Sequence, residues 1–455
     1  MTARTRSRGV ALIGTAVTAS LLIASCSSSS TGSGTNSSAS SDPACAAFSA
    51  YQGHSGTTVS MFASILSPES DSLQKSWAEF SKCTGITIAY EGSNSFESQL
   101  PVKVSGGNAP DLAIIPQPGL LAKMVTTGKV AKPPQGVVDN VTNDWNAAWK
   151  SYGTVNGTFY AAPMSSNAKS LVWYSPKEFT AAGYTVPTTW SDLMALSGKI
   201  AAAGKNGKPW CGGIGSGTAT GWPATDWLEE VMLRMYGGDV YDQWIANTLK
   251  FNDPKVKAAM DTVAGWMKNP AWVNGGFGGV QSIATTTFQD AGQPILKQQC
   301  WMLQQASFYA AQFPAGTNVG PTGDVFAFYL PSMGQFGNPV EGGGEFVTAF
   351  AGRPEVQAVQ TYLSTPDWAT SRIKVASGWV SANNKVDPNV YTNSIDKLSF
   401  QELTDPKATF RFDASDAMPS AVGSGSEWKQ LTAWFAGSKD TQAVLDAIQA
   451  SWPTS

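Results

Sequence analysis

Residues 57–115 read TTVSMFASILSPESDSLQKSWAEFSKCTGITIAYEGSNSFESQLPVKVSGGNAPDLAII. The segment opens with a β-rich run at Thr57–Ala63 and closes with the wholly apolar Leu112–Ile115, which is typical of a strand buried on both faces of a parallel sheet. An alternating run at Ile86–Tyr90 lies between them, with apolar residues at helical spacing on either side. This β-α-β-α-β order predicts an open α/β sheet.

The helix between the first two strands has recognisable ends. Ser67 and Pro68 are expected to form its N-cap and first position, and Gly85 is expected to end it. Ligands of such sheets bind in the loops beyond the carboxyl ends of the strands. Here these loops are residues 62–67, 91–96 and 116–119.

The rest of the chain continues the α/β pattern. Further strands are expected at 171–174, 325–330 and 346–350, and further helices at 190–203, 224–236, 255–268 and 354–364. A chain of 455 residues is too long for one compact core, which indicates two domains or lobes.

The composition excludes several classes of function. Charged residues make up 14% of the chain, against roughly 25% in an ordinary globular protein. The net charge of −3, with no block of Lys or Arg, gives no electrostatic support for a nucleic-acid partner. The single histidine, His54, excludes multi-histidine metal sites, and it leaves no Ser–His–Asp site unless it serves itself. We therefore expect no metal, no cofactor and no catalytic residue.

The amino terminus has the pattern of a bacterial lipoprotein signal. An arginine-rich start precedes an apolar stretch at 10–24, which is too short to span a bilayer. The tetrapeptide IASC at 23–26 resembles a lipobox, so we expect residues 1–25 to be a signal peptide and the Cys26 thiol to be acylated. An ordinary signal peptide is the alternative, but residues 26–43 form a Ser-rich flexible tether, which favours the lipoprotein.

Six segments resemble one family and keep a consistent order along most of the chain. They are YEGSNSFESQL at 90–100, GNAPD at 107–111, PQPG at 116–119, KSLVWY at 169–174, GWPATDW at 221–227 and CWM at 300–302. The family is that of the extracellular sugar-binding proteins of ABC importers (family 1 solute-binding proteins), and GWPATDW is more specific to its α-glucoside branch. The resemblance implies a two-lobed, maltose-binding-protein-like fold with discontinuous lobes and a hinge that closes on the ligand.

Discontinuous lobes require several crossings of the chain. We place these crossings near Asn167, Asp324 and Ser377. One lobe then contains residues 44–167 and 325–376, and the other contains 168–324 and 377–455.

Four cysteines remain after Cys26, and outside the cell they are expected to form disulfides. Three pairings are possible. We favour Cys45–Cys83 and Cys211–Cys300, because each pair lies inside one expected lobe.

A sugar presents an apolar C–H face, on which aromatic rings stack, and a rim of hydroxyls, which carboxylates bind strongly as acceptors. Aromatic residues beside acids in loops are therefore the expected signature. Trp222 lies in a Gly/Pro loop, and Asp226 follows it by four positions at an expected helix start, so both can face one direction. Trp227 is interpreted as a core residue of that helix.

Other candidate ligand contacts lie in the first half of the chain. Ser93 and Asn94 follow a strand end, although Asn94 can instead cap the next helix. Gln117 lies in the loop after the next strand, and Lys169 opens one of the segments that carry the resemblance.

The second half of the chain adds acids and aromatics. Glu345 ends the sequence EGGGE at 341–345, which lacks the Lys-Ser/Thr of a P-loop and is expected to bring backbone and a carboxylate to the ligand. Trp379, in a Ser-Gly-Trp loop, is expected to be a stacking platform, and Phe308 is a weaker aromatic candidate. Asp413 and Asp416 either contact the ligand or cap a helix.

These features predict a monomeric binding lipoprotein that captures a carbohydrate, with α-glucosides the best guess, and delivers it to the transmembrane permease of an ABC importer. It is expected on the extracellular face of the membrane of a Gram-positive or actinobacterial cell. One alternative is a secreted glycoside-active enzyme, which needs two carboxyls across one glycosidic bond. The other is a binding protein for a peptide or a polyamine, for which a more charged cleft is expected.

Overall fold

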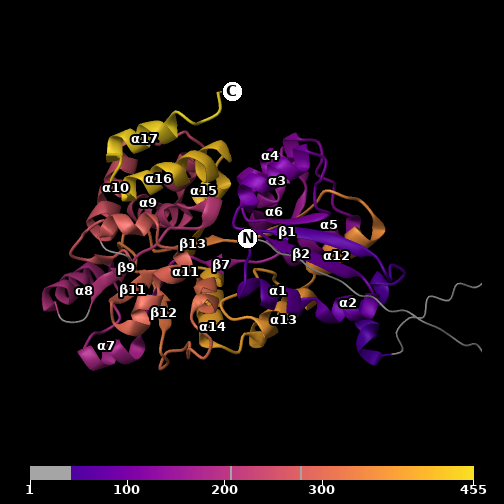
Figure 1. Ribbon diagram of the computed structural model, residues 1–455, viewed down its shortest axis with the longest axis horizontal. Helices are drawn as coiled ribbons and strands as arrows, with labels where there is room; N and C mark the ends of the chain where they lie inside the picture. The colour runs from indigo at the N-terminus through magenta and orange to yellow at the C-terminus, as the bar shows by residue number, and fades with distance from the viewer. Residues whose placement is uncertain (1–41, 205–206, 277–278, 455) are drawn as a thin grey trace, which may run out of the picture. The chain divides into compact units, whose positions relative to one another are not determined.

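The computed structural model describes residues 42–204, 207–276 and 279–454, and these form one α/β unit (Figure 1). The expected signal peptide, Cys26 and nearly all of the tether lie outside the described residues. Within the described ranges, no helix combines the length and the apolar character needed to cross a bilayer.

The first sheet has the strand order β2-β1-β3-β14-β6. Its strands are β1 (Thr58–Ala63), β2 (Thr87–Gly92), β3 (Leu112–Ile115), β6 (Ala161–Pro163) and β14 (Phe346–Ala349). β1 pairs in parallel with β2 and with β3, whereas β14 runs antiparallel between β3 and β6. The open α/β sheet expected from residues 57–115 is confirmed, and every residue of β3 is buried as a strand covered on both faces requires.

Helices cover this sheet on both sides. They are α1 (Glu69–Ser76), α2 (Ala78–Thr84), α3 (Phe96–Ser105), α4 (Pro118–Thr126), α5 (Gln135–Asp144), α6 (Ala147–Tyr152), α12 (Pro354–Leu363) and α13 (Pro366–Val375). The single helix expected from Ser67 to Gly85 is wrong, because Trp77 leaves helical geometry (φ −113°, ψ 7°) and separates α1 from α2. Pro68 takes the N-cap position, while Gly85 ends α2 in the left-handed region (φ 72°), as predicted.

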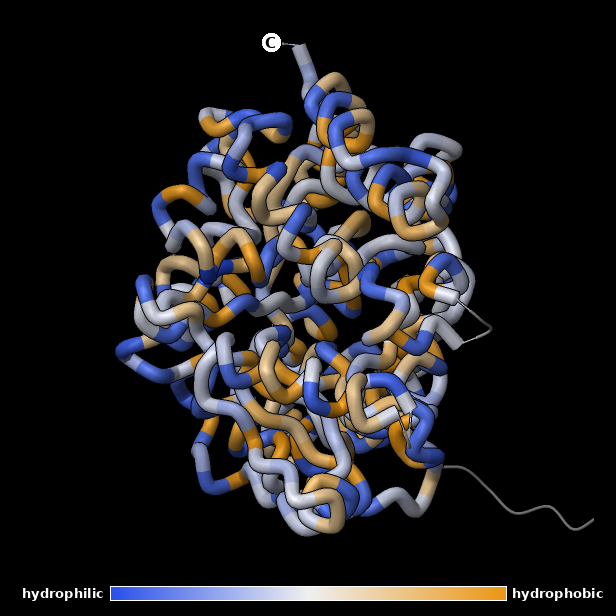
Figure 2. Tube along the Cα trace, turned by 90° about the vertical axis from the view of Figure 1, so that its left-hand side faces the viewer, coloured by the Kyte–Doolittle hydropathy of each residue, from blue (hydrophilic) through white to orange (hydrophobic). Residues whose placement is uncertain are grey.

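The second sheet has the order β10-β9-β11-β8-β12. Its strands are β8 (Leu171–Tyr174), β9 (Lys208–Cys211), β10 (Val273–Asn274), β11 (Cys300–Gln304) and β12 (Phe326–Tyr329). Its neighbouring helices are α7 (Pro176–Ala182), α8 (Trp190–Ala203), α9 (Trp222–Ile245), α10 (Pro254–Met267), α11 (Phe288–Ala291), α16 (Trp428–Phe435) and α17 (Thr441–Gln449). Hydrophobic and hydrophilic residues alternate along the outer helices on this side of the molecule, as expected of amphipathic helices packed on a core (Figure 2).

A three-stranded sheet of β15 (Ala408–Phe412), β13 (Asn338–Gly343) and β7 (Asn167–Ala168) joins the two larger sheets. β7 lies between β6 and β8 in the sequence, and β13 lies between β12 and β14, so each strand leads from one large sheet to the other. We propose that two of the lobe crossings run through β7 and β13. This moves one crossing beyond Asp324, because β12 pairs antiparallel with β8 of the second sheet.

The remaining elements are short. They are the hairpin β4 (Thr154–Val155) and β5 (Thr158–Phe159), the helices α14 (Ser394–Thr404) and α15 (Ala414–Ala417), the 3-10 helices η1 (Pro43–Tyr51), η2 (Gly217–Ala219), η3 (Val280–Ala284), η4 (Gln293–Lys297), η5 (Ser307–Gln312) and η6 (Pro388–Val390), and the π-helix η7 (Ala421–Glu427).

Both favoured disulfides are confirmed. Cys45–Cys83 joins η1 to α2 beside the first sheet, and Cys211–Cys300 joins the neighbouring strands β9 and β11 of the second.

Candidate ligand-binding site

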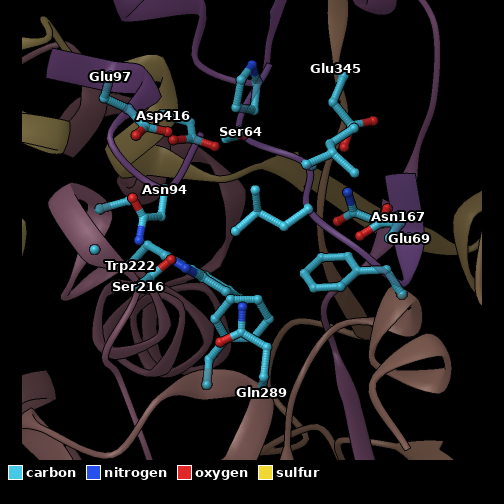
Figure 3. A pocket seen from close by; sticks show the side chains of 18 of the residues that line it. Ser64, Glu69, Asn94, Glu97, Asn167, Ser216, Trp222, Gln289, Glu345 and Asp416 are labelled. Atoms are coloured by element: carbon cyan, nitrogen blue, oxygen red, sulfur yellow. The ribbon is translucent and has the colours of Figure 1, made fainter. Parts of the chain in front are cut away.

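A cavity of about 360 Å³ lies where the strand ends of the first sheet face α9 and α15 (Figure 3). The segments that follow β1, β2 and β3 contribute Ser64, Asn94 and Gln117 to its wall. Trp222 of α9 and Asp416 of α15 also line it. The loops at the carboxyl ends of the parallel strands therefore open onto one cavity.

Most of the side chains singled out in the sequence meet at this cavity. Eight of the eleven line it: Asn94, Gln117, Lys169, Trp222, Phe308, Glu345, Asp413 and Asp416. Ser93, Asp226 and Trp379 are not part of the lining.

The hydroxyl of Ser93 forms hydrogen bonds within its own segment of the chain. Its Oγ donates to Gln99 Oε1 (2.9 Å) and accepts from the backbone N–H of Ser95 (3.1 Å). Both partners belong to the first turns of α3, so Ser93 fixes the entry of the chain into that helix, while its neighbour Asn94 lines the cavity.

Trp379 lies in the core of the first sheet rather than in the cavity wall. Its indole is 5% exposed and packs edge to face on Trp368, with ring centroids 5.5 Å apart. The Arg372 guanidinium lies 5.5 Å from the same ring. This packing uses the faces of the indole that a stacked sugar needs.

Trp379→Phe therefore tests a structural role. We expect the unfolding free energy to fall by about 1.5 kcal/mol, because the smaller ring leaves a gap against Trp368. Denaturant unfolding measures this loss, and calorimetry is expected to give an unchanged dissociation constant for the ligand. A tenfold weaker affinity for the ligand with unchanged stability would contradict this structural role and would show that the Trp379 ring contacts the ligand.

Three aromatic rings form one wall of the cavity. The Trp222 ring packs against Phe288 and Phe308, with centroids 5.1 Å and 6.0 Å apart. Trp222 is placed by Gly221, whose φ of 116° suits glycine and where a Cβ would lie 2.3 Å from the carbonyl oxygen of Trp428. Phe288 was missed in the sequence, because α11 is one short turn with no motif around it.

Lys169 is buried among carboxylates beside this wall. Its Nζ donates to Asp226 Oδ1 (2.7 Å) and to Asp413 Oδ2, and lies 4.0 Å from Glu341 Oε1. Burial alone lowers the pKa of Lys169, but the surrounding carboxylates outweigh it and hold the pKa well above its ordinary value. The ammonium is therefore charged and ties β7 to α9 and to the segment before α15.

The three carboxylates around Lys169 have the spacing of metal ligands. One oxygen each from Asp226, Glu341 and Asp413 lies within 4.8 Å of the others. The Lys169 ammonium already binds two of them, so in this cluster a lysine supplies the positive charge. Asp226, expected to face the ligand, is 1% exposed and instead holds Lys169 from behind; burial raises its pKa to about 7.

Asp413 and Asp416 belong to a capped turn at the cavity. Asp413 Oδ1 accepts from the backbone N–H of Asp416 (2.8 Å) and from Ser415 Oγ (2.9 Å), as expected of a helix N-cap. Behind the turn, the carboxylate of Glu229 accepts from the N–H groups of Ala414 (2.6 Å) and Ser415 (3.0 Å). Capping and cavity lining therefore occur together in this segment.

Three glutamates join Asp413 and Asp416 and give the cavity an acidic lining. Glu69 and Glu345 lie near Asn167, and Glu97 lies beside Asp416 (Figure 3). Burial and the Glu69 carboxyl raise the pKa of Glu345 to about 8. Burial likewise raises the pKa values of Glu69, Glu97 and Asp416 above their ordinary range.

Glu69 and Glu97 line the cavity but were not predicted from the sequence, because they lie just outside the expected ligand loops. The expected ligand loops ended at residues 67 and 96, and these glutamates stand in the first turns of α1 and α3, just beyond. Acidic residues are common in first turns because of the helix dipole, so their type alone gave no functional signal.

Two α/β lobes around a cavity of this kind define a hinged binding protein. The chain belongs to the bacterial extracellular solute-binding proteins, whose family model matches residues 66–372. The family and the relatives that match this chain are binding proteins rather than enzymes.

Two relatives match most of the chain. The osmoprotective compounds-binding protein GgtB of Synechocystis sp. is 35% identical over 403 residues, covering 87% of this chain and 92% of the relative. The alpha-glucosides-binding periplasmic protein AglE of Rhizobium meliloti is 36% identical over 399 residues, covering 84% of each. Among solved structures, the bacterial solute receptor AcbH superposes with a TM-score of 0.73 at 19% identity, covering 88% of this chain and 97% of AcbH, and shows the shared fold.

Proposed function

We propose that this protein captures a small α-glucoside in the cavity and delivers it to the permease of an ABC importer. The observation that carries the proposal is the pairing of an aromatic wall with an arc of acceptor side chains around one cavity of about 360 Å³. That volume lies at the small end of the roughly 300–1,000 Å³ typical of small-molecule sites, which supports a ligand of one or two sugar rings.

The acceptors around the cavity support a polyol ligand. Gln117 and Asn167 are both more than nine-tenths buried, and their amide oxygens accept no hydrogen bond from the described residues. Buried polar atoms are normally paired, so these oxygens call for donors from a ligand or water. Sugar hydroxyls supply such donors, while the C–H face of the sugar covers Trp222 and its neighbours.

The relatives support the choice of ligand. One relative is named for α-glucosides and the other for osmoprotective compounds, and both match this chain over more than four-fifths of its length. A compatible solute that is also an α-glucoside, such as a small disaccharide, satisfies both descriptions.

The remaining parts of the proposal concern delivery. Acylated Cys26 and the Ser-rich tether keep the monomeric binding unit at the extracellular face of the cell membrane. Closure about β7 and β13, where the chain links the two sheets, then buries the ligand and presents both lobes to the permease.

A calorimetric panel tests the ligand class. It contains trehalose, maltose, sucrose, maltotetraose, glycine betaine, a tripeptide and spermidine. We expect saturable binding of at least one α-linked disaccharide, weaker binding of maltotetraose, and no hydrolysis products. Binding of spermidine or the peptide alone would overturn the carbohydrate proposal, and steady release of glucose would make the protein an enzyme.

Trp222→Ala tests the aromatic wall. We expect the dissociation constant for the bound disaccharide to rise about tenfold, since stacking contributes roughly 0.5–1.5 kcal/mol beyond the buried area. Trp272→Ala, which removes a half-buried indole outside the cavity lining, is the matched control. Equal affinities for Trp222→Ala and the parent, with both folded by circular dichroism, would contradict the placement.

A further inference from the structure

The charges that face the cavity are unbalanced. Five carboxyl groups of the described residues line it, from Glu69, Glu97, Glu345, Asp413 and Asp416, and the lining contains a single cation, Lys169. That ammonium is already bound by Asp226 and Asp413.

The remaining carboxyl groups differ in their surroundings. The charge of Arg372, which borders the adjoining small cavity together with Glu69, acts on both Glu69 and Glu345. Among the described residues, neither Glu97 nor Asp416 forms an ion pair.

Glu97 and Asp416 approach each other from two parts of the fold. Glu97 lies in the first turn of α3, which follows β2 of the first sheet, and Asp416 lies in α15, which packs on α9 beside the second. Their carboxyl groups lie together at one side of the cavity (Figure 3). Glu97 accepts from the side chains of Gln117 and Thr218, whereas no side chain of the described ranges donates to Asp416.

Gln117, next to Glu97 in the cavity lining, adds a hydrogen-bond acceptor. Gln117 is 4% exposed and lines the cavity, and its Oε1 has no partner in the described chain. Two carboxyl groups and a free amide oxygen in one place suit a group that brings several donors. A positively charged donor suits them best, because charge-assisted hydrogen bonds are the strong ones. The aromatic rings of Trp222, Phe288 and Phe308 close the same cavity, and aromatic faces also attract organic cations.

We propose that the cavity selects saccharides that carry a basic nitrogen, with the protonated amine held between Glu97 and Asp416. The inference rests on the proposed function and deepens it, because it names the ligand as an amino or imino sugar of one or two rings. Neutral α-glucosides occupy the same cavity with lower affinity.

The test compares matched ligands in a titration calorimeter at pH 7. Trehalose and maltose are each measured beside analogues in which one hydroxyl is replaced by an amino group, position by position, and beside the N-acetyl form of each analogue. We expect at least one amine to bind tenfold or more tightly than its parent sugar. Its N-acetyl form, which keeps the nitrogen but loses the charge, is expected to lose that advantage.

Variants locate the effect. Glu97→Gln and Asp416→Asn are expected to bring the ratio of amine affinity to parent affinity close to one. Glu79→Gln, which removes an exposed carboxylate of α2 outside the cavity, is expected to keep the ratio of the unaltered protein. Thermal melts verify that each variant is folded, and the N-acetyl comparison needs no variant at all.

The pH dependence provides an independent arm. Asp416 is faced by Glu97, Asp413, Asp226 and Lys169. Burial raises the pKa values of Glu97 and Asp416, so lowering the pH to 5 adds protons to this pair. We expect the preference for the amine to shrink at pH 5. If the parent sugars bind and no amine binds more tightly, this inference is overturned and the proposed function stands; if no saccharide binds in any form, the proposed function itself fails.

Discussion

Replacing Lys169 by methionine is expected to lower the unfolding free energy by about 3–5 kcal/mol at pH 8 and to abolish measurable ligand binding. Methionine keeps much of the apolar stem but removes the ammonium that binds Asp226 and Asp413. The two carboxylates, both about 1% exposed, then remain buried without a counter-charge. Guanidinium unfolding measures the loss of stability, and titration calorimetry measures the loss of affinity.

The sign of the pH dependence distinguishes this cause from a simple packing defect. The folded pKa of Lys169 lies above its ordinary value, so its stabilisation is complete below about pH 10 and is lost only as the pH rises through the folded pKa. The carboxyl of Asp226 behaves oppositely. Burial raises the pKa of Asp226 to about 7 even beside the ammonium, so the folded chain holds this proton more tightly than the unfolded chain. The variant therefore loses stability as the pH rises above about 4, and its deficit is smaller at pH 5 than at pH 8.

Lys177→Met is the matched control for this substitution. Lys177 pairs with Asp324 at 2.7 Å, but both side chains are exposed. Exposed pairs contribute about 0–1 kcal/mol, and we expect a loss within that range with no change in ligand affinity. A Lys169→Met variant that unfolds like Lys177→Met at both pH values would show that the buried carboxylates do not depend on the ammonium.

The elements with strong local signals could be predicted from the sequence. α8 has the predicted bounds because Thr189 caps its start by accepting from Asp192 N–H, and Gly204 ends it in the left-handed region. β8 likewise matches its apolar run at 171–174. β13 was not predicted, because its sequence NPVEGG ends in two glycines, which are rare in strands. Its pairing with the distant β15 also cannot be inferred from local composition.

The cavity-lining residues that could be predicted are those next to a predicted strand end or helix start. Asn94 and Gln117 line the cavity because they follow strand ends, and Trp222 lines it as the first residue of α9. Trp379 has the same local appearance, but its partners Trp368 and Arg372 are brought to it by α13 only in the folded chain. Local sequence therefore cannot distinguish an aromatic ring that lines a binding site from one that packs against other side chains in the core.

The buried charges behind the cavity were the largest omission. In the sequence WLEEVMLRM at 227–235, Glu229 and Glu230 read as the solvated face of an amphipathic helix. In the structure both are 0% exposed, because α9 is packed on nearly all sides. Glu230 pairs with Arg234 one turn along α9, but only tertiary contacts show that these acids also lie near Lys169 and the segment that carries Asp413.

Glu229→Ala is the second substitution from which we expect a large effect. Besides the N–H groups of Ala414 and Ser415, the carboxylate of Glu229 accepts from the hydroxyl of Tyr241 (3.0 Å). Alanine leaves the N–H of Ser415 without an acceptor in a buried place, which costs about 1–3 kcal/mol. The N–H of Ala414 keeps the Tyr241 hydroxyl and that hydroxyl keeps the carbonyl of Phe412, but each loses one of two acceptors, and the removed side chain leaves a cavity with a cost of its own. We expect a total loss of about 3–5 kcal/mol in unfolding free energy. The turn that positions Asp413 and Asp416 also loses its support, and we expect ligand affinity to fall at least a hundredfold.

A graded series separates positioning of the turn from loss of stability. Glu229→Gln keeps one acceptor oxygen but turns an amide N–H₂ toward a backbone donor, and it is expected to lose about half as much of both quantities. Glu402→Gln, a partly buried glutamate of α14 outside the cavity lining, is expected to leave affinity unchanged. Calorimetry well below each melting temperature keeps the unfolded fraction negligible, so a fall in affinity there reports a displaced turn. A Glu229→Ala variant that binds the sugar as tightly as the parent under those conditions would mean that the cap made by Asp413 holds the turn without help from α9.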